Sequence, residues 1–415
     1  MTALQQQGAA AKATSYTLAT AGTERKNAAL DAIATILTQR RAEWLSANAE
    51  DIAAAKAAGM RPAMLDRLSL TEERIAGIVD GVRQVMALPD PIGTVTKMET
   101  RPNGLIIGRR RVPLGVIAMI FEARPNVTVD AAALCLKSGN ACILRGGKEA
   151  IRSNCKAAEL MREGLRLAGL PADCISLVQD TSHETANELM HLDGYVDVLI
   201  PRGGAGLIRA VAKEASVPVI RTGEGVCHIY IDNEADLDMG ANILYNAKCS
   251  RPSVCNSVEC LLIHEDVAAA FLKKAVPLLD KHQVELRCDE KALAILGDRA
   301  VPAAESDWDA EYEDYILAIR TVADTEEAIS FINAHGTGHS EAIITTNYFK
   351  AQRFLDAVDA AAVYVNASTR FTDGGEFGLG AEIGISTQKM HARGPMGLEE
   401  LTSCKYVIYG EGQVR

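Results

Sequence analysis

The stretch Asn246-Ala-Lys-Cys-Ser-Arg-Pro-Ser-Val-Cys-Asn-Ser-Val-Glu-Cys-Leu-Leu-Ile263 joins a helical segment to a strand-like segment. Apolar residues at helical spacing occupy residues 237–248, and the sequence Ser250-Arg-Pro252 ends that helix. An apolar strand is expected from Val258. We expect its faces to alternate, with Val258, Cys260 and Leu262 on one face and Glu259, Leu261 and Ile263 on the other.

A short polar loop lies between the helix and the strand, and it carries Cys255 and Asn256. A rigid strand fixes the position of such a loop, while the loop stays open to a substrate. This placement suits a nucleophile. We therefore expect Cys255 to act as a nucleophile in its thiolate form.

Short apolar runs alternate with helical stretches on both sides of this segment, which predicts parallel sheets covered on both faces. The first α/β series has expected strands at 115–121, 140–144, 174–178, 196–200 and 217–220. The second series, within residues 228–365, contains the Cys255 loop, a strand at 316–322, a helix at 325–334 and a strand at 342–345. A terminal strand is expected at 404–409.

Residues 1–90 are rich in Ala, Glu, Lys and Arg at helical spacing, and we expect a helical flank there. Ser69-Leu-Thr-Glu72 is a candidate capping box for a helix over residues 72–88. The turn Pro102-Asn-Gly104 lies between two extended runs and predicts a hairpin. The basic run Arg109-Arg-Arg111 is either a phosphate site or, as we favour, a surface that is solvated or meets a partner chain.

The amino-acid composition limits the classes of function that this chain can have. The chain has 415 residues, 48% of them hydrophobic, and a net charge of −11, which argues against nucleic acid or an anionic membrane as partner. No apolar run is long enough to span a membrane, and residues 1–7 do not resemble a signal peptide. Ten cysteines are too sparse for a disulfide scaffold, and the closest group, Cys249, Cys255 and Cys260, lacks metal-ligand spacing. We expect no metal site and a cytoplasmic protein.

Two glycine-rich turns follow expected strands and open into helices, where the helix N-terminus can bind phosphate. Gly204-Ala-Gly206 departs from the dinucleotide fingerprint because Arg209 stands in place of its third glycine. Arg145 and Lys148 flank two glycines and suit the extra phosphate of NADPH, although solvated surface cations are an equally good reading. The expected cofactor-binding residues here are Arg145, Gly146, Gly147, Lys148, Gly203, Gly204 and Gly206.

Five stretches resemble the aldehyde dehydrogenase superfamily over essentially the whole chain, and within it the branch that reduces γ-glutamyl phosphate. They are Phe121-Glu-Ala-Arg-Pro-Asn126, Arg251-Pro-Ser-Val-Cys-Asn256, His335-Gly-Thr-Gly-His-Ser-Glu341, residues 365–384 and Gln388-Lys-Met-His-Ala-Arg-Gly-Pro395. The resemblance implies an α/β fold with two Rossmann-type domains and a small β oligomerisation flap. In that flap, the hairpin would pair with the terminal strand of a neighbouring chain.

The implied domain bounds are as follows: 1–97 and 113–227 for the NADP-binding domain, 228–365 for the catalytic domain, 98–112 and 400–415 for the flap, and 366–399 for a glycine-rich segment facing substrate and cofactor.

The resemblance also implies the reaction, in which NADPH reduces L-glutamyl 5-phosphate to L-glutamate 5-semialdehyde and phosphate, the second step of proline biosynthesis. Cys255 would form a thioester, and its backbone N–H would stabilise the oxyanion together with Asn126 or, if the match is shifted, Arg124. We expect Arg370 and Glu376 to bind the amino-acid end of the substrate beside Asn256. Glu311 falls where the superfamily has a glutamate on the nicotinamide ribose.

Hydrolytic members of the superfamily carry a glutamate before the thiol loop, and that position falls near Arg221 or Thr222 in this chain. Release by phosphate needs no such base, although Glu224 could serve as one after a small shift. Two alternatives therefore stay open: an acid-forming aldehyde dehydrogenase and a non-catalytic nucleotide-binding protein of the same fold. The resemblance further implies a homodimer or homotetramer and a possible association with glutamate 5-kinase.

Overall fold

The computed structural model describes residues 1–122 and 124–415; Ala123, within one of the matching stretches, lies outside the described residues. The chain forms two compact units, each described by itself. Unit 1 comprises Met1–Thr222, Gly378–Gly384 and Met396–Arg415, and unit 2 comprises Gly223–Phe377 and Ile385–Pro395. Each unit is built around a parallel sheet that carries helices, which confirms the predicted α/β fold class.

Unit 1 holds a four-stranded sheet in the order β5-β4-β3-β6, with neighbouring strands parallel. Its strands are β3 (Val116–Phe121), β4 (Ala141–Arg145), β5 (Ile175–Leu177) and β6 (Val198–Arg202). The helices between and after them are α6 (Pro125–Lys137), α7 (Ile151–Leu167), α8 (His183–Met190) and α9 (Ala205–Glu214). The strand expected at 217–220 is wrong, since only an isolated bridge joins Val219 to Leu199. Pro218 has no N–H to donate to a continuing ladder.

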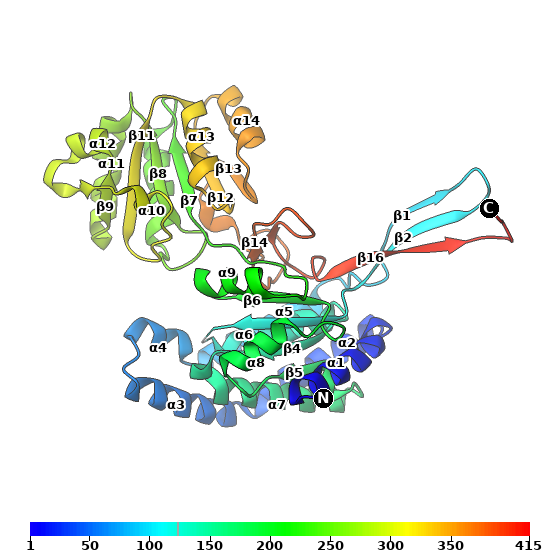
Figure 1. The fold of residues 1–415 in the computed structure, drawn as a ribbon. Coiled ribbons are helices and arrows are strands. Elements are labelled where there is room, and N and C mark those ends of the chain that lie inside the picture. Colours follow the sequence, from blue (N-terminus) through cyan, green and yellow to red (C-terminus); the bar gives the residue numbers. More distant parts are fainter. Residues whose placement is uncertain (123) are drawn as a thin grey trace. The chain divides into compact units, whose positions relative to one another are not determined.

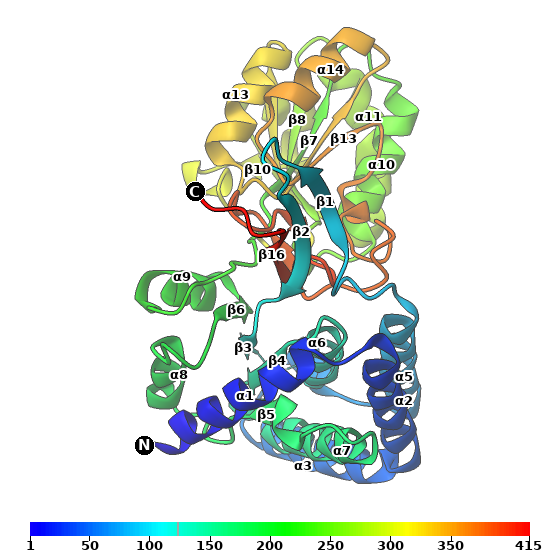
Figure 2. The same ribbon diagram turned by 90° about the vertical axis from the view of Figure 1, so that its right-hand side faces the viewer.

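The helical flank is confirmed. It consists of α1 (Ala3–Ala19), α2 (Thr23–Gln39), α3 (Arg41–Ala57), α4 (Pro62–Leu68) and α5 (Glu72–Ala87). Figure 2 shows α1 lying along β4 and β5, and α2 beside α5. The capping box predicted at Ser69 is wrong. Thr71 is the N-cap instead, and its hydroxyl accepts from the N–H of Arg74 at 3.1 Å, whereas the Ser69 hydroxyl donates to the carbonyl of Leu65.

Three antiparallel strands form the flap sheet in the order β1-β2-β16 (Figure 1). They are β1 (Val95–Thr100), β2 (Ile106–Pro113) and β16 (Thr402–Tyr409). The predicted hairpin is confirmed, and Gly104 takes a positive φ of 87° in its turn. The predicted pairing with a neighbour's terminal strand is corrected, because β16 of the same chain pairs with β2 along its whole length.

Unit 2 holds a seven-stranded parallel sheet in the order β10-β9-β11-β8-β7-β12-β13. Its strands are β7 (Cys227–Ile231), β8 (Val258–His264), β9 (Glu285–Cys288), β10 (Val301–Pro302), β11 (Ile316–Val322), β12 (Ser340–Ile344) and β13 (Ala362–Val365). Helices α10 (Leu237–Cys249), α11 (Ala268–Leu279) and α12 (Glu290–Leu296) share one apolar core with the sheet. Helices α13 (Thr325–His335) and α14 (Tyr348–Ala357) cover the other face (Figure 1). The short strands β14 (Ile385–Ser386) and β15 (Gly394–Pro395) pair with each other.

The alternation predicted for β8 is correct only from Cys260 onward. Val258 shares its core with Leu261 and Ile263, whereas Cys260 belongs to the core on the opposite face. The reason is a register shift against β7. Cys227 lies opposite Val258 and His228 lies opposite Cys260, so that Glu259 is skipped.

Among residues 1–122 and 124–415, no helix combines the length and the apolar character that crossing a bilayer requires.

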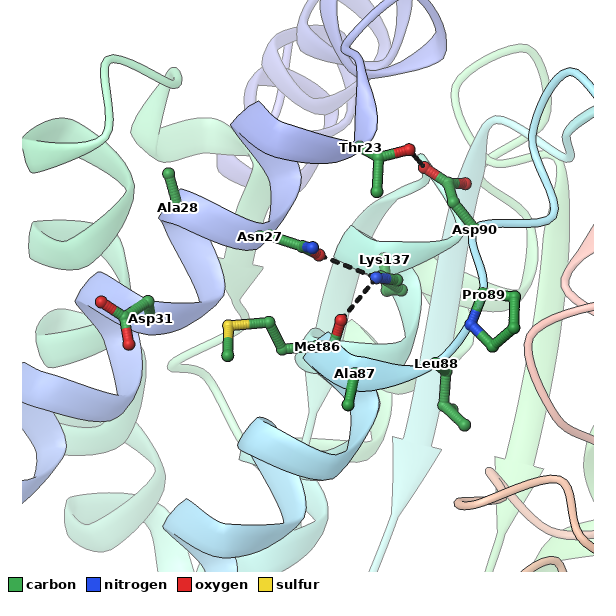
Figure 3. Close-up of a pocket in the computed structure, with 10 residues that line it drawn as sticks. All are labelled: Thr23, Asn27, Ala28, Asp31, Met86, Ala87, Leu88, Pro89, Asp90 and Lys137. Carbon is green, nitrogen blue, oxygen red and sulfur yellow. Dashed lines mark hydrogen bonds between the residues drawn. The ribbon is translucent and has the colours of Figure 1, made fainter.

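A buried lysine joins three helices of unit 1. Lys137, at the end of α6, is 0% exposed and donates to the side-chain oxygen of Asn27 on α2 and to the carbonyl of Met86 on α5, each at 2.7 Å. Burial lowers the pKa of Lys137, the nearby carboxylate of Asp90 raises it and Lys26 lowers it further. Figure 3 shows both hydrogen bonds among the residues that line a pocket of about 740 Å³, which are Thr23, Asn27, Ala28, Asp31, Met86, Ala87, Leu88, Pro89, Asp90 and Lys137.

Replacing Lys137 by methionine keeps most of the unbranched side chain but removes the donor that Asn27 and Met86 share. We expect the free energy of unfolding to fall by about 1–3 kcal/mol, because both acceptors lose a charged partner. Urea denaturation followed by circular dichroism measures this change. Exposed Lys56→Met is the matched control and should change stability by less than about 0.5 kcal/mol. Equal effects of the two substitutions would contradict this role for Lys137.

Candidate active site

Cys255 lies half-buried on the loop between α10 and β8. Helix α10 has Asp236 as its N-cap, whose carboxylate accepts from the N–H groups of Asp238 and Met239, each at 3.0 Å. The helix ends at Cys249, just before Pro252, as predicted. The loop is therefore anchored by a capped helix on one side and a central strand of the sheet on the other.

The backbone of Cys255 packs directly against the segment that leads into β7. A methyl group on Gly225 would lie 1.5 Å from the Cys255 carbonyl oxygen, so only glycine fits there. The thiol of Cys227, 0% exposed, donates to the same carbonyl oxygen at 3.2 Å. Burial raises the pKa of Cys227 well above its usual value, which keeps this thiol protonated as a donor. Both contacts fix the peptide group that presents the candidate nucleophile.

A chain of buried polar side chains continues from Cys227. Its sulfur lies 3.8 Å from Nδ1 of His339, which in turn lies 2.8 Å from the hydroxyl of Ser340. That hydroxyl is 2.6 Å from the hydroxyl of Thr372, and the phenol of Tyr364 is 2.7 Å from Thr372. Burial lowers the pKa of His339 to about 4, so the imidazole is neutral at pH 7. His339 therefore contacts the sulfur of Cys227, which in turn bonds the carbonyl of Cys255.

Glu341 forms a separate buried contact with His228. Its carboxylate accepts from the backbone N–H of His228 at 2.7 Å and lies 3.1 Å from its ring Nδ1. Glu341 therefore joins β12 to β7 inside unit 2, which is a structural role.

Asn256 is held by the backbone of the segment after β13. Its amide donates to the carbonyl oxygens of Arg370 at 3.2 Å and Thr372 at 3.0 Å. The guanidinium of Arg370 donates to the side-chain oxygen of Asn256 and to the hydroxyl of Ser250 at 3.1 Å. Unit 2 thus brings Asn256 and Arg370 together beside Cys255, as expected for residues of one site.

The pKa of Arg370 also reflects its proximity to the thiol of Cys255. Burial and the neighbouring cation of Arg251 lower the pKa of Arg370, whereas Cys255 and Asp373 raise it. Arg370 is therefore a half-buried cation within electrostatic reach of Cys255. Glu376, by contrast, is exposed, in a turn whose N–H groups bond the carboxylate of Asp373.

Glu311 is tied to the same segment as the thiol. Its carboxylate accepts from the N–H of Gly225 at 3.0 Å, and Gly225 is the residue that packs on Cys255. Burial raises the pKa of Glu311, and the carboxylates of Glu313 and Glu224 raise it further, while the bond from Gly225 lowers it.

The predicted oxyanion residues lie at the start of α6 in unit 1. Arg124 is the N-cap of this helix. Asn126 lies in its first turn and donates to the carboxylate of Asp130 at 2.9 Å. Burial raises the pKa of Asp130, and the hydrogen bond from Asn126 opposes that rise.

The first predicted phosphate turn follows β4. Gly146 is required by close packing, since a methyl group there would lie 2.2 Å from the amide nitrogen of Asn154. Arg145 points back into the protein and donates to the carbonyl oxygens of Thr181 at 2.7 Å and Ser182 at 3.1 Å. Gly147 precedes the helical turn that begins with exposed Lys148. Of the two cations, Lys148 is the one that faces solvent.

The second predicted phosphate turn joins β6 to α9. Gly204 is the N-cap of α9, and its N–H donates to the carboxylate of Glu122 at 2.9 Å. A methyl group on Gly203 would lie 2.7 Å from the same carboxyl group, whereas Gly206 faces open space. Close packing against Glu122 explains why residue 203 is glycine. The N-terminus of α9 is also the kind of site at which backbone N–H groups bind anions.

Sequence reasoning missed Gly225 and Cys227, although both contact Cys255 directly. The glycines at 223 and 225, just before a strongly apolar strand, were the signal that the backbone comes close to something there. The partner was hidden because Cys255 is thirty residues further along the chain.

Similarity to known proteins shows the family of this chain. The model of the aldehyde dehydrogenase family matches residues 3–294 and 309–407. The chain is 59% identical over 408 residues to γ-glutamyl phosphate reductase of Clostridium perfringens, covering 98% of each chain. It is 57% identical over 415 residues to the enzyme of that name from Enterococcus faecalis, covering 100% of this chain and 99% of the relative.

Solved structures give the same result. The crystal structure of γ-glutamyl phosphate reductase from Thermotoga maritima matches with a TM-score of 0.97 at 46% identity, covering 99% of both chains. The acetylating aldehyde dehydrogenase of Geobacillus thermoglucosidasius shares the fold, with a TM-score of 0.72 at 17% identity over 99% of this chain and 97% of that one. This chain therefore belongs to the aldehyde dehydrogenase family, in its γ-glutamyl phosphate reductase branch.

Proposed function

We propose that this chain is a glutamate-5-semialdehyde dehydrogenase that reduces L-glutamyl 5-phosphate with NADPH, releasing L-glutamate 5-semialdehyde and phosphate in the second step of proline biosynthesis. The observation that carries the proposal is Cys255, held on the loop before β8 by Gly225 and Cys227. The names of the full-length relatives support the choice of substrate.

The first half of the reaction forms a thioester. The thiolate of Cys255 attacks the γ-carbonyl carbon of the acyl phosphate, and the carbonyl oxygen becomes an oxyanion. When the carbonyl re-forms, the bond to the phosphate oxygen breaks and phosphate leaves. Two donors suit the oxyanion: the backbone N–H of Cys255 and the side-chain amide of Asn126, with Arg124 as the alternative to Asn126.

The second half reduces the thioester to an aldehyde. NADPH, when bound, supplies the hydride that the thioester carbon accepts. The same oxyanion donors stabilise the resulting hemithioacetal. The carbon–sulfur bond then breaks, so that the semialdehyde leaves and Cys255 returns to its thiolate form.

Release by phosphate rather than by water is supported by the residues before β7. Of Arg221 and Thr222, near which the base of hydrolytic relatives is expected, Thr222 is 7% exposed and its hydroxyl donates to the carbonyl of Pro201 at 2.7 Å. A hydroxyl used in this way activates no water, so the thioester is preserved for reduction.

The amino-acid end of the substrate needs a cation for its carboxylate and an anion for its ammonium group. We assign Arg370 to the carboxylate, because it is a half-buried cation within electrostatic reach of Cys255. Its contacts with Asn256 and Ser250 hold the guanidinium in place. We assign exposed Glu376 to the ammonium group.

A phosphorylated nicotinamide dinucleotide fits the turns of unit 1. Exposed Lys148 follows β4 and suits the 2′-phosphate. The N–H of Gly204 is already used by Glu122, so we assign the pyrophosphate to the N–H groups of the first turn of α9 that follows it. Glu311, half-buried and bonded to the N–H of Gly225, suits a ribose hydroxyl. Arg145 serves this site indirectly, by fixing the carbonyls of Thr181 and Ser182.

The flap supports a homodimer or homotetramer, because its exposed residues include large apolar side chains that a second copy would cover. They are Val95, Met98, Ile106, Tyr406, Ile408 and Tyr409. We further propose association with glutamate 5-kinase, since an acyl phosphate hydrolyses readily in free solution. The compartment we propose is the cytoplasm, where thiols such as Cys255 stay reduced.

The reverse reaction tests the chemistry. With glutamate 5-semialdehyde and NADP, we expect NADPH formation that requires phosphate, and a loss of more than about a thousandfold in Cys255→Ala, since no other group replaces the nucleophile. Absorbance at the NADPH band follows the rate. Turnover that needs no phosphate would instead indicate an acid-forming dehydrogenase with Glu224 as its base. NADPH binding without turnover in either protein would indicate a non-catalytic binding protein.

Cofactor choice tests Lys148. We expect Lys148→Ala to raise the KM for NADPH about tenfold and to leave the KM for NADH within twofold, because only the former carries the 2′-phosphate. Lys213→Ala removes an exposed lysine from α9 of the same unit and is the matched control. An equal rise in the KM for NADPH and the KM for NADH would contradict the assignment of Lys148 to the 2′-phosphate.

The packing of Gly225 on Cys255 is also testable. Gly225→Ala places a methyl group where the Cys255 carbonyl lies, so the peptide must move, and we expect kcat to fall about a hundredfold. Gly77→Ala, where a methyl group meets open space, should leave kcat unchanged. Steady-state kinetics with circular dichroism as a folding check decides the outcome, and a fully active Gly225→Ala protein would disprove the tight contact.

A further inference from the structure

A buried ion pair brackets the loop of Cys255. Lys248 lies in the last turn of α10 and Glu259 is the second residue of β8. The Lys248 Nζ and the Glu259 Oε2 are 2.6 Å apart, and the two side chains are 0% and 1% exposed. The pair therefore ties together the two ends of the segment 250–257, which carries the nucleophile.

The register of β8 explains how Glu259 reaches Lys248. Because the pairing with β7 passes from Val258 directly to Cys260, Glu259 is the extra residue of the shift. Extra residues of this kind re-aim a side chain and occur often beside active sites. The carboxylate of Glu259 lies at the helix end, where it meets Lys248.

Stability alone does not account for this pair. Burial raises the pKa of Glu259 to about 8 and lowers the pKa of Lys248, which means that the surroundings disfavour both charges. Within residues 1–122 and 124–415, the second carboxylate oxygen of Glu259 makes no hydrogen bond of good geometry, and the backbone of Glu313 only partly offsets the effect of burial on its pKa. Buried ion pairs with unmet hydrogen bonds are often no more stable than apolar side chains of the same size.

The pair also faces the segment that carries Glu311. The Lys248 Nζ lies 5.9 Å from the centre of the Tyr312 ring, and the carboxylate of Glu311 is one of the groups that raise the pKa of Glu259. One buried contact thus borders two segments of the candidate active site, the thiol loop and the residues at 311–312.

We propose that Lys248 and Glu259 are positioning residues: their ion pair fixes the loop that presents Cys255 and holds it in register with the segment of Glu311. The proposal rests on the proposed function only in taking Cys255 as the nucleophile. Neither side chain is proposed to touch the substrate.

The test removes both charges at once in Lys248→Met/Glu259→Met, so that no lone buried charge remains. We expect the urea midpoint of this protein to equal or exceed that of the native protein. We expect kcat of the phosphate-dependent reverse reaction to fall about tenfold or more, with the KM for NADP within twofold, because the thiol is displaced. The pH profile of Cys255 alkylation by iodoacetamide, read by fragmentation of the Cys255 peptide, should be displaced as well.

The control is a buried ion pair of equal length in unit 1. The Lys26 Nζ and the Asp90 carboxylate are 2.6 Å apart, with side chains 0% and 8% exposed. Lys26→Met should lower the urea midpoint but leave kcat and the alkylation profile unchanged. If the double variant does not fold, Glu259→Gln, which keeps the size of the side chain, carries the same two readouts.

A folded double variant with native kcat and a native alkylation profile would overturn the proposal and leave the pair a purely structural role. The alkylation readout is independent of the proposed reaction. If the native protein shows no phosphate-dependent turnover, the proposed function fails, and the alkylation profile by itself then decides the role of the pair.

Discussion

The contact between the Cys255 carbonyl and the α-carbon of Gly225 is the constraint on which the candidate site depends. A side chain of any size at position 225 would occupy the space of the Cys255 peptide. The thiol of Cys227 fixes the same carbonyl, and the carboxylate of Glu311 fixes the N–H of Gly225. One short backbone segment therefore positions both the candidate nucleophile and the carboxylate proposed to meet the nicotinamide ribose.

The parallel sheet of unit 2 explains why these residues meet. Gly225 precedes β7, Cys255 precedes β8, Glu311 precedes β11 and His339 precedes β12. Neighbouring parallel strands begin at the same edge, so residues far apart in the chain gather there. In unit 1 the proposed cofactor groups lie instead after β4 and β6, at the carboxyl edge that nucleotide-binding sheets commonly use. Within unit 1 the proposed groups thus follow their strands, and within unit 2 they precede their strands.

Local sequence patterns predicted correctly the helices and strands whose bounds depend only on nearby residues. The strand at 316–322 and the helix that ends before Pro252 follow from apolar spacing and helix-stop residues, and the structure confirms both. The same patterns gave wrong predictions where a single residue interrupted the regular pairing of strands. Pro218 prevents a strand at 217–220, and the skipped Glu259 reverses the face on which Val258 lies. A periodic pattern contains no signal for a register shift, because the shift is set by the neighbouring strand.

The sequence by itself determined the α/β class and the family, and it singled out Cys255 as the candidate nucleophile, because apolar periodicity and the stretch around Cys255 are local in the chain. Only the tertiary structure decided which side chains serve a neighbour rather than a ligand. Arg145 turns inward to two carbonyls, and Asn256 is held by the backbone at Arg370 and Thr372. These roles depend on contacts between segments widely separated in sequence, and such contacts exist only once the sheets have formed.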